Sequence, residues 1–219
     1  GARIGKNCKI HSGSVISSVP QDLKYKGEQT VATIGDNTVI RECVTINRGT
    51  MANGDTNIGK NCLLMAYVHV AHDCIIHDNV ILVNAVQLAG HIEVGYHAVI
   101  GGSSAIHQFV SIGEHVMISG GSMILKDVPP YVMAARMPLR YDGINRRGLR
   151  RRNFSNEQIY HIQDIYRIIF QSGLNNTQAI QEVSKSVEVS EERDKIIAFF
   201  QRSAESGRGV IKGTPRVSR

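Results

Sequence analysis

An aliphatic residue recurs at every sixth position over twelve consecutive hexapeptides, and this period constrains the fold of the 219-residue chain more than any other feature. The repeating positions are Ile58, Leu64, Val70, Ile76, Leu82, Leu88, Val94, Ile100, Ile106, Ile112, Ile118 and Ile124. The residue four positions after each, from Cys62 to Val128, is also small or β-branched. A helix repeats near 3.6 residues and a half-buried strand near 2, so a period of six predicts a solenoid. Three hexapeptides make one three-sided coil, and residues 18 apart should stack about 4.8 Å from each other.

The repeat extends over most of residues 1–134 and is interrupted by two insertions. The period already holds at the start of the chain, pauses over residues 17–33, and pauses again over residues 51–57. Insertions in solenoids form outer loops that often carry function. The repeat ends at Pro129 and Pro130, where strand hydrogen bonding would fail. We predict a β-helix domain over 1–134, and we expect N-terminal coils to be missing because the chain starts mid-pattern without methionine.

Residues 135–219 show a helical pattern instead. Ser155 and Gln158 form a capping box before a run of isoleucines spaced for one helix face. Thr177 and Ser190 are predicted to cap two further helices. We therefore expect a basic connector followed by a small helical domain that packs against the solenoid.

The net charge of +6 is concentrated in this second part. Residues 1–134 hold 9 Lys and Arg against 10 Asp and Glu, whereas residues 135–219 hold 16 against 9. The densest cluster is Arg146, Arg147, Arg150, Arg151 and Arg152. Such a cluster indicates phosphate or an acidic protein as partner, or else a solvated surface. Nucleic acid is disfavoured because the cluster has little aromatic interleaving and no binding motif. The tail from Ser206 is expected to be loose.

Other classes of protein are disfavoured by composition. The apolar runs are far shorter than a membrane span, and no export leader opens the chain, so we expect a cytoplasmic protein. Cys8, Cys62 and Cys74 fall at inward hexapeptide positions, and Cys43 lies one residue off that column. Because no CxxC pair is present, we expect reduced packing residues and no metal site.

Eighteen-residue stacking brings several histidines onto one strip of the predicted prism. The strip contains His72, Gly90 and Gln108 in one column, Asp73, His91 and His107 in the flanking columns, and His69 just around the edge. An imidazole takes a proton from a hydroxyl near neutral pH, so His72 is a candidate general base. Gly90 lacks a side chain, so its N–H is accessible to an oxyanion. Asp73 could orient His72, although neighbouring residues of a strand point to opposite faces.

A second column contains Gly102 and Gly120, with Asn84 and Ala66 below. Such a column offers a smooth path for a linear apolar chain. Alternatively, these glycines merely serve tight corners.

With these residues in view, the sequence resembles the bacterial UDP-N-acetylglucosamine O-acyltransferases that begin lipid A synthesis. The matching segments are QDLKYKGE from Gln21, IRECVTINRGT from Ile40, NCLLMAYVHVAHDC from Asn61, LAGHIEV from Leu88, IGGSSAIHQF from Ile100, DVPPYVMA from Asp127 and GLRRRNFS from Gly148. Hexapeptides alone are shared by many acyltransferases, whereas the histidine segments together with QDLKY are specific.

The resemblance implies a homotrimer of left-handed β-helices, without a cofactor, that moves a 3-hydroxyacyl chain from acyl carrier protein to the glucosamine 3-hydroxyl of UDP-N-acetylglucosamine. It implies that His72 is the base and that the Gly90 amide holds the oxyanion. Implied substrate contacts are Gln21, Asp22, Lys24, His69, His91, His107 and Gln108, with Asn145, Arg151 and Arg152 on the UDP portion. Gly120 matches the position that limits acyl length. Arg147 departs from the family, where an acidic residue is expected.

Three alternatives remain open at this point. A zinc carbonic anhydrase on the same scaffold would use His72 and His77, but a third histidine is missing two coils upstream, where Asp36 stands. The N-acyltransferase of the same pathway uses similar coils on an amine, whereas the helical C-terminus and QDLKY favour O-acylation. A non-catalytic hexapeptide subunit gives no reason for aligned histidines.

Overall fold

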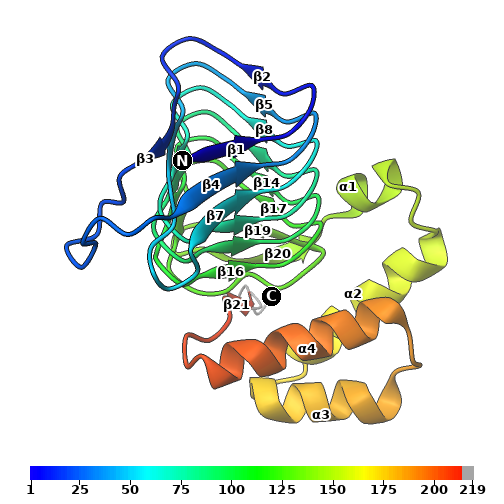
Figure 1. The fold of residues 1–219 in the computed structure, drawn as a ribbon. Helices are drawn as coiled ribbons and strands as arrows, with labels where there is room; N and C mark the ends of the chain where they lie inside the picture. Colours follow the sequence, from blue (N-terminus) through cyan, green and yellow to red (C-terminus); the bar gives the residue numbers. More distant parts are fainter. Residues whose placement is uncertain (214–219) are drawn as a thin grey trace.

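The computed structural model describes residues 1–213, and most of them form a three-sided prism of short parallel strands (Figure 1). Face A contains β1 (Ala2–Ile4), β4 (Val31–Ile34), β7 (Asp55–Ile58), β10 (Ile75–Ile76), β13 (Glu93–Val94) and β16 (Ser111–Ile112). Face B contains β2 (Lys9–Ile10), β5 (Val39–Ile40), β8 (Leu63–Leu64), β11 (Ile81–Leu82), β14 (Val99–Ile100), β17 (Met117–Ile118), β19 (Val132–Ala135), β20 (Arg140–Ile144) and β21 (Lys212–Gly213). Face C contains β3 (Val15–Ser18), β6 (Thr45–Asn47), β9 (His69–Val70), β12 (Gln87–Leu88), β15 (Ala105–Ile106) and β18 (Met123–Ile124).

The strand register confirms the eighteen-residue stacking. Ile76 pairs with Val94, and Leu82 pairs with Ile100. All twelve aliphatic residues of the long repeat are at most 3% exposed and fill the interior of the prism. Burial of one such side chain stabilises a fold by roughly 1.5–3 kcal/mol, so the period in sequence reflects one continuous core.

Tight turns form the three corners of the prism, and one residue in each lies in the left-handed region. Asp73 (φ 60°), His91 (φ 60°) and Phe109 (φ 64°) occupy this position on three successive coils. These residues belong to turns, so the rule that strand neighbours point to opposite faces does not apply to them.

The last coil is closed by strands that the repeat did not predict. β19 pairs in parallel with β17, and β20 then runs antiparallel to β19. The segment that we expected to be a connector therefore contains a strand of face B, which lies between β19 and β21. A short helix, α1 (Arg146–Arg151), follows it, and Asn145 caps this helix by accepting from the Gly148 amide.

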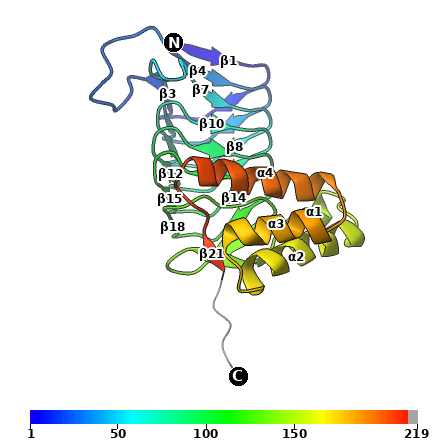
Figure 2. The ribbon, with the colours of Figure 1, turned by 90° about the horizontal axis from the view of Figure 1, so that it is seen from below.

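Three further helices lie alongside the C-terminal coils of the prism, and Lys195 of the last helix pairs with Glu114 next to face A (Figures 1 and 2). α2 (Asn156–Gln171) begins with the predicted Ser155 capping box, and α4 (Glu191–Glu205) begins with the predicted Ser190 cap. Thr177 was the wrong cap for α3 (Asn176–Ser186). Asn175 caps that helix because Gln178, three residues on, completes its capping box.

Residues 206–213, which follow α4, pack against the β-helix, and this corrects the expected loose tail over these residues. Val210 and Ile211 are buried, and β21 pairs with β20. The end of the predicted tail, residues 214–219, lies outside the described residues. Within residues 1–213, no helix has the length and apolar character needed to cross a membrane.

Candidate active site

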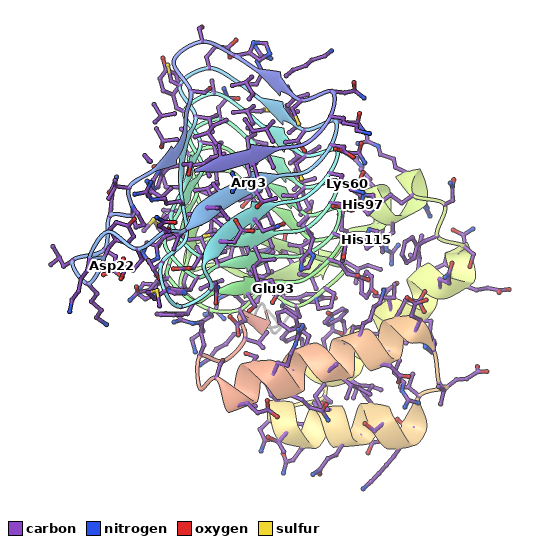
Figure 3. All side chains as sticks on the ribbon, in the orientation of Figure 1. Arg3, Asp22, Lys60, Glu93, His97 and His115 are labelled. Carbon is purple, nitrogen blue, oxygen red and sulfur yellow. The ribbon has the colours of Figure 1, made fainter. Side chains whose placement is uncertain are left out.

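The turns that lead from face C to face A form corner C–A, and both insertions lie there. The first insertion joins β3 to β4 and projects from the prism, with Asp22 near its tip (Figure 3). The second joins β6 to β7 over residues 48–54, which corrects the predicted range of 51–57. The following turns of the same corner carry the predicted histidine strip, at residues 71–74, 89–92 and 107–110. The fold therefore concentrates its irregular segments around His72.

His72 and Asp73 form a hydrogen-bonded pair at this corner. The Asp73 Oδ2 lies 2.7 Å from the His72 Nδ1, and the Asp73 side chain is fully buried. The second insertion supplies further donors to this carboxylate, from the amide of Thr50 at 2.9 Å and its hydroxyl at 2.7 Å. Our argument against Asp73 from strand alternation was wrong, because its left-handed turn conformation places both side chains together.

These contacts set the protonation of the pair. Burial alone would raise the pKa of the Asp73 carboxyl, but the hydrogen bonds from His72 and Thr50 outweigh it and hold the pKa below its ordinary value. An ionised carboxylate only accepts hydrogen bonds. The Nδ1 of His72 must therefore carry a proton, and its Nε2 is left with a lone pair when the ring is neutral.

His91 completes the cluster from the next coil. Its ring meets that of His72 edge-on at a centroid distance of 5.1 Å and stacks on Phe109 at 4.6 Å. The His91 Nε2 lies 3.7 Å from the Asp73 Oδ2. Burial lowers the pKa of His91, which favours the neutral ring at pH 7.

Gly90 lies directly against the His72 ring. A Cβ at this position would come within 2.7 Å of Cε1 and 2.8 Å of Nε2 of His72, so any side chain here would displace the imidazole. The Gly90 amide donates no hydrogen bond within residues 1–213. A free N–H beside an imidazole lone pair is the arrangement that an oxyanion and a general base require.

The side chains of His72, Asp73 and His91 are also close enough to be compared with a metal site. One ligand atom each of His72, Asp73 and His91 lies within 4.8 Å of the others. Ligands of a tetrahedral zinc ion are about 3.3 Å apart, given metal–ligand bonds of about 2.0–2.2 Å. The 2.7 Å between His72 and Asp73 is shorter than this and fits a charge-assisted hydrogen bond. The geometry therefore favours an acid–base pair.

The other residues of the predicted strip have separate partners. His69, on face C, lies 2.7 Å from the Thr45 hydroxyl, and burial lowers its pKa. His107 and Gln108 are exposed at corner C–A, one coil beyond Gly90. No contact joins His107 to His72 or His91 within the described part of the chain.

Residues of the first insertion act on this cluster through their charges. Asp22 raises the pKa of His91 and Lys24 lowers it, although burial remains the larger influence. Gln21 belongs to the same projecting loop. This loop, which follows the first coil, thus brings polar groups near the histidines of later coils.

Two predicted groups lie at the other corners of the prism. Gly102 and Gly120 stack at corner B–C, between β14 and β15 and between β17 and β18. Asn145 donates to the His115 carbonyl and Arg152 to the His97 carbonyl, which places both at corner A–B. Figure 3 shows His97 and His115 on the side of the prism away from Asp22. Arg151, the last residue of α1, is exposed. A single protomer therefore does not bring the histidines, the stacked glycines and the predicted nucleotide-binding residues together.

Sequence reasoning missed the residues that hold Asp73. The Thr50 and Asn53 amides, from the second insertion, donate to the Asp73 carboxylate. The Thr56 hydroxyl, on β7, accepts from the Asp73 amide. The signal was available in part, since the insertion precedes the histidine turn by one coil. The bonds themselves depend on the loop path, which no period encodes.

Comparisons with known proteins first define the class. Residues 55–90 match the bacterial transferase hexapeptide model of six repeats, and residues 127–211 match the model of UDP-N-acetylglucosamine O-acyltransferase, domain 2. The fold class that we predicted is confirmed: a left-handed parallel β-helix of hexapeptide repeats followed by a helical region. The class is that of the hexapeptide transferases.

Individual relatives then define the family. A Chlorobaculum parvum protein named acyl-[acyl-carrier-protein]–UDP-N-acetylglucosamine O-acyltransferase is 53% identical, over 97% of this chain and 80% of its own length. The UDP-N-acetylglucosamine acyltransferase of Bacteroides fragilis superposes with a TM-score of 0.94 at 50% identity, over 97% and 82% of the two chains. The Arabidopsis enzyme gives 0.85 at 29% identity, over 96% and 90%. The chain belongs to the acyl-[acyl-carrier-protein]–UDP-N-acetylglucosamine O-acyltransferase family.

Proposed function

We propose that the protein transfers a 3-hydroxyacyl chain from acyl carrier protein to the glucosamine 3-hydroxyl of UDP-N-acetylglucosamine, as the first step of lipid A synthesis. The observation that carries this proposal is the His72–Asp73 pair placed against the free Gly90 amide. The family relationship supports the substrates. Such substrates are cytoplasmic, so we expect the protein to act there.

The geometry supports direct transfer with His72 as the base. The lone pair on its Nε2 takes the proton of the sugar hydroxyl as the oxygen attacks the thioester carbonyl carbon. The Gly90 N–H stabilises the oxyanion that forms on the carbonyl oxygen. When the C–S bond breaks, the His72 imidazolium returns the proton to the departing thiolate. Asp73 fixes the ring and stabilises its charged form throughout.

The separation of the three corners supports a homotrimer as the active species. Asn145 and Arg152, which match nucleotide-binding positions, lie at a different corner from His72. Threefold symmetry would bring corner A–B of one subunit, or corner B–C with its glycines, beside corner C–A of the next. The acyl chain would then pass Gly102 and Gly120, where an added Cβ on Gly120 would come 3.1 Å from the Gly102 carbonyl.

The function is tested by incubating the protein with UDP-N-acetylglucosamine and a panel of hydroxyacyl carrier proteins. NMR and mass spectrometry of the product identify the acylated atom and the chain length. We expect an ester at the glucosamine 3-oxygen. A product formed only with a 3-amino sugar acceptor, or no product with any carrier protein, would contradict the proposal.

The role of His72 is tested with His72→Ala. Removing the base should lower kcat on the order of 10²- to 10⁴-fold, because proton transfer in the transition state is lost. His11→Ala is the matched control, since His11 is half-exposed on the first coil and pairs with Glu42. Near-full turnover of His72→Ala with normal sugar nucleotide binding would show that another group is the base.

A further inference from the structure

Arg208 reaches corner C–A from the opposite end of the chain. Its Nη1 lies 3.2 Å from the Nδ1 of His107 and 3.4 Å from the Leu125 carbonyl oxygen. The residue follows α4, in the segment that sequence reasoning expected to be loose. No part of the hexapeptide pattern or of the arginine cluster indicated this contact.

Two glycines determine the path of the backbone around Arg208. Gly207 (φ 70°) and Gly209 (φ 75°) flank it in the left-handed region, which a residue with a side chain adopts only at a cost. The Arg208 amide donates to the Ser206 hydroxyl. The sequence Gly-Arg-Gly therefore builds a turn that projects a single arginine.

Asp127 attaches this turn to the β-helix. Its amide donates to the Gly209 carbonyl at 3.1 Å, and its carbonyl accepts from the Ile211 amide at 3.0 Å. Its buried carboxylate accepts from the Ser203 hydroxyl and the Ser111 amide. Backbone and side chain of one buried residue thus fix the segment on both sides, so the position of Arg208 follows from the fold.

Two groups compete for the same nitrogen of His107. The Gln108 carbonyl lies 3.1 Å from Nδ1 and can only accept a hydrogen bond, whereas the Arg208 guanidinium lies 3.2 Å away and can only donate one. The distances are nearly equal, so charge decides. A charge-assisted hydrogen bond is roughly twice as strong as a neutral one, which leaves Nδ1 as the acceptor.

We propose that Arg208 is a positioning residue that holds His107 in the Nε2–H tautomer, so that His107 donates a hydrogen bond to an oxygen of the bound substrate. This inference rests on the proposed function. It gives the two histidines opposite roles: Asp73 leaves a lone pair on the Nε2 of His72, and Arg208 leaves a proton on the Nε2 of His107. Stacked strands are about 4.8 Å apart, so this donor lies about one coil from the Gly90 amide.

The test is ¹⁵N NMR of the histidine rings in the full chain, with Arg208→Met. The His107 signals are assigned from their absence in His107→Gln. We expect wild-type His107 to carry its proton on Nε2 and the variant to carry it on Nδ1, bonded to Gln108. The loss of one substrate hydrogen bond should raise KM about 3- to 10-fold. Lys212→Met is the matched control, because it removes a cation four residues further along the same segment and should change neither reading.

A double variant separates this effect from any loosening of the segment. In the His107→Gln background, Arg208→Met should cause no further change in KM, because its influence passes through the missing imidazole. An unchanged His107 tautomer in Arg208→Met, or an equal KM effect in both backgrounds, would overturn the inference. A wild-type protein without acyltransferase activity would instead contradict the proposed function, while the tautomer reading would stand independently.

Discussion

At the scale of single residues, the catalytic proposal depends on three groups in a fixed order: the Asp73 carboxylate, the His72 ring and the Gly90 amide. Asp73 stays ionised although it is buried, because His72 and residues of the second insertion donate to it. A buried carboxylate without such donors would be protonated and would release the ring. The corner therefore works as a unit, and changes to its members should not be additive.

We predict that Asp73→Asn lowers kcat roughly 10- to 10³-fold with little change in KM. The asparagine amide can donate to Nδ1 of His72, which would favour a proton on Nε2 and remove the base. Steady-state kinetics with both substrates measure the effect. Asp36→Asn is a control for the same change in the turn between β4 and β5, where Asp36 accepts from the Lys6 amide. Equal kcat values for wild type and Asp73→Asn would exclude this role.

His115 provides a prediction about stability and pH. It is 9% exposed, stacks on His97 at 5.0 Å, and its Nδ1 has no hydrogen-bond partner within residues 1–213. Burial lowers its pKa to about 4, whereas the unfolded chain titrates near 6.5. The unfolded state binds more protons between these values, so the free energy of unfolding should fall as pH drops from about 6.5 to about 4.

We expect this residue to account for a loss on the order of 2 kcal/mol over that range. His115→Phe should remove that part of the pH dependence, and Phe109 shows that an aromatic ring fits the same left-handed turn position. Urea unfolding at a series of pH values measures it. Parallel stability curves for wild type and variant would contradict the assignment.

At the scale of elements, the second insertion acts as a support for the histidine turn. It interrupts the repeat between β6 and β7 and bonds to Asp73 through both backbone and side chain. An insertion in a solenoid costs little stability if it stays outside the core. Here the irregular segment supplies donors that regular turns lack.

We predict that Thr50→Val lowers kcat about 3- to 10-fold and the free energy of unfolding by about 1 kcal/mol, because one buried hydrogen bond to a carboxylate is lost. Thr33→Val makes the same change on the outer side of β4, away from the site, and should leave kcat unchanged. Kinetics and urea unfolding of both variants provide the comparison. A wild-type kcat for Thr50→Val would mean that the insertion does not support Asp73.

The elements differ in how far the sequence predicted them. The hexapeptide period predicted each buried residue of the long repeat, because every coil imposes the same local packing. The period did not predict the Asp73–His72 contact, which depends on a turn conformation. It also did not predict the contact of Arg208 with His107, 101 residues away, because that contact depends on how Asp127 holds a distant segment. A repeated local packing pattern can be recognised in the sequence, whereas a single contact between distant residues cannot.

At the scale of the whole molecule, the three corners carry different chemistry. Corner C–A holds the histidines, corner B–C the stacked glycines, and corner A–B the Asn145 and Arg152 contacts. A complete site must combine corners of neighbouring subunits if all three serve one reaction. The proposed trimer provides this combination at each subunit boundary.

We predict that two inactive variants restore activity when they share one trimer. His72→Ala and the double variant Arg151→Ala, Arg152→Ala should each be inactive alone. If the two corners come from different subunits, about one site in three of every mixed trimer has both functional corners. Co-expression with two affinity tags and kinetics of the doubly purified trimer measure this fraction. Activity at the level of the separate variants would place both corners in one subunit's own site.

The strand that closes the last coil also determines how copies of the chain can associate. The last strand of a parallel sheet has unpaired backbone N–H and C=O groups, and a strand of another chain can pair with them and extend the sheet into a fibre. In face B the antiparallel β20 and the short β21 pair beyond the last parallel strand of the repeat. Face B therefore ends in an antiparallel strand and a two-residue strand, which are poor templates for further pairing. The flat sides of the prism are the larger surfaces for a closed, finite assembly.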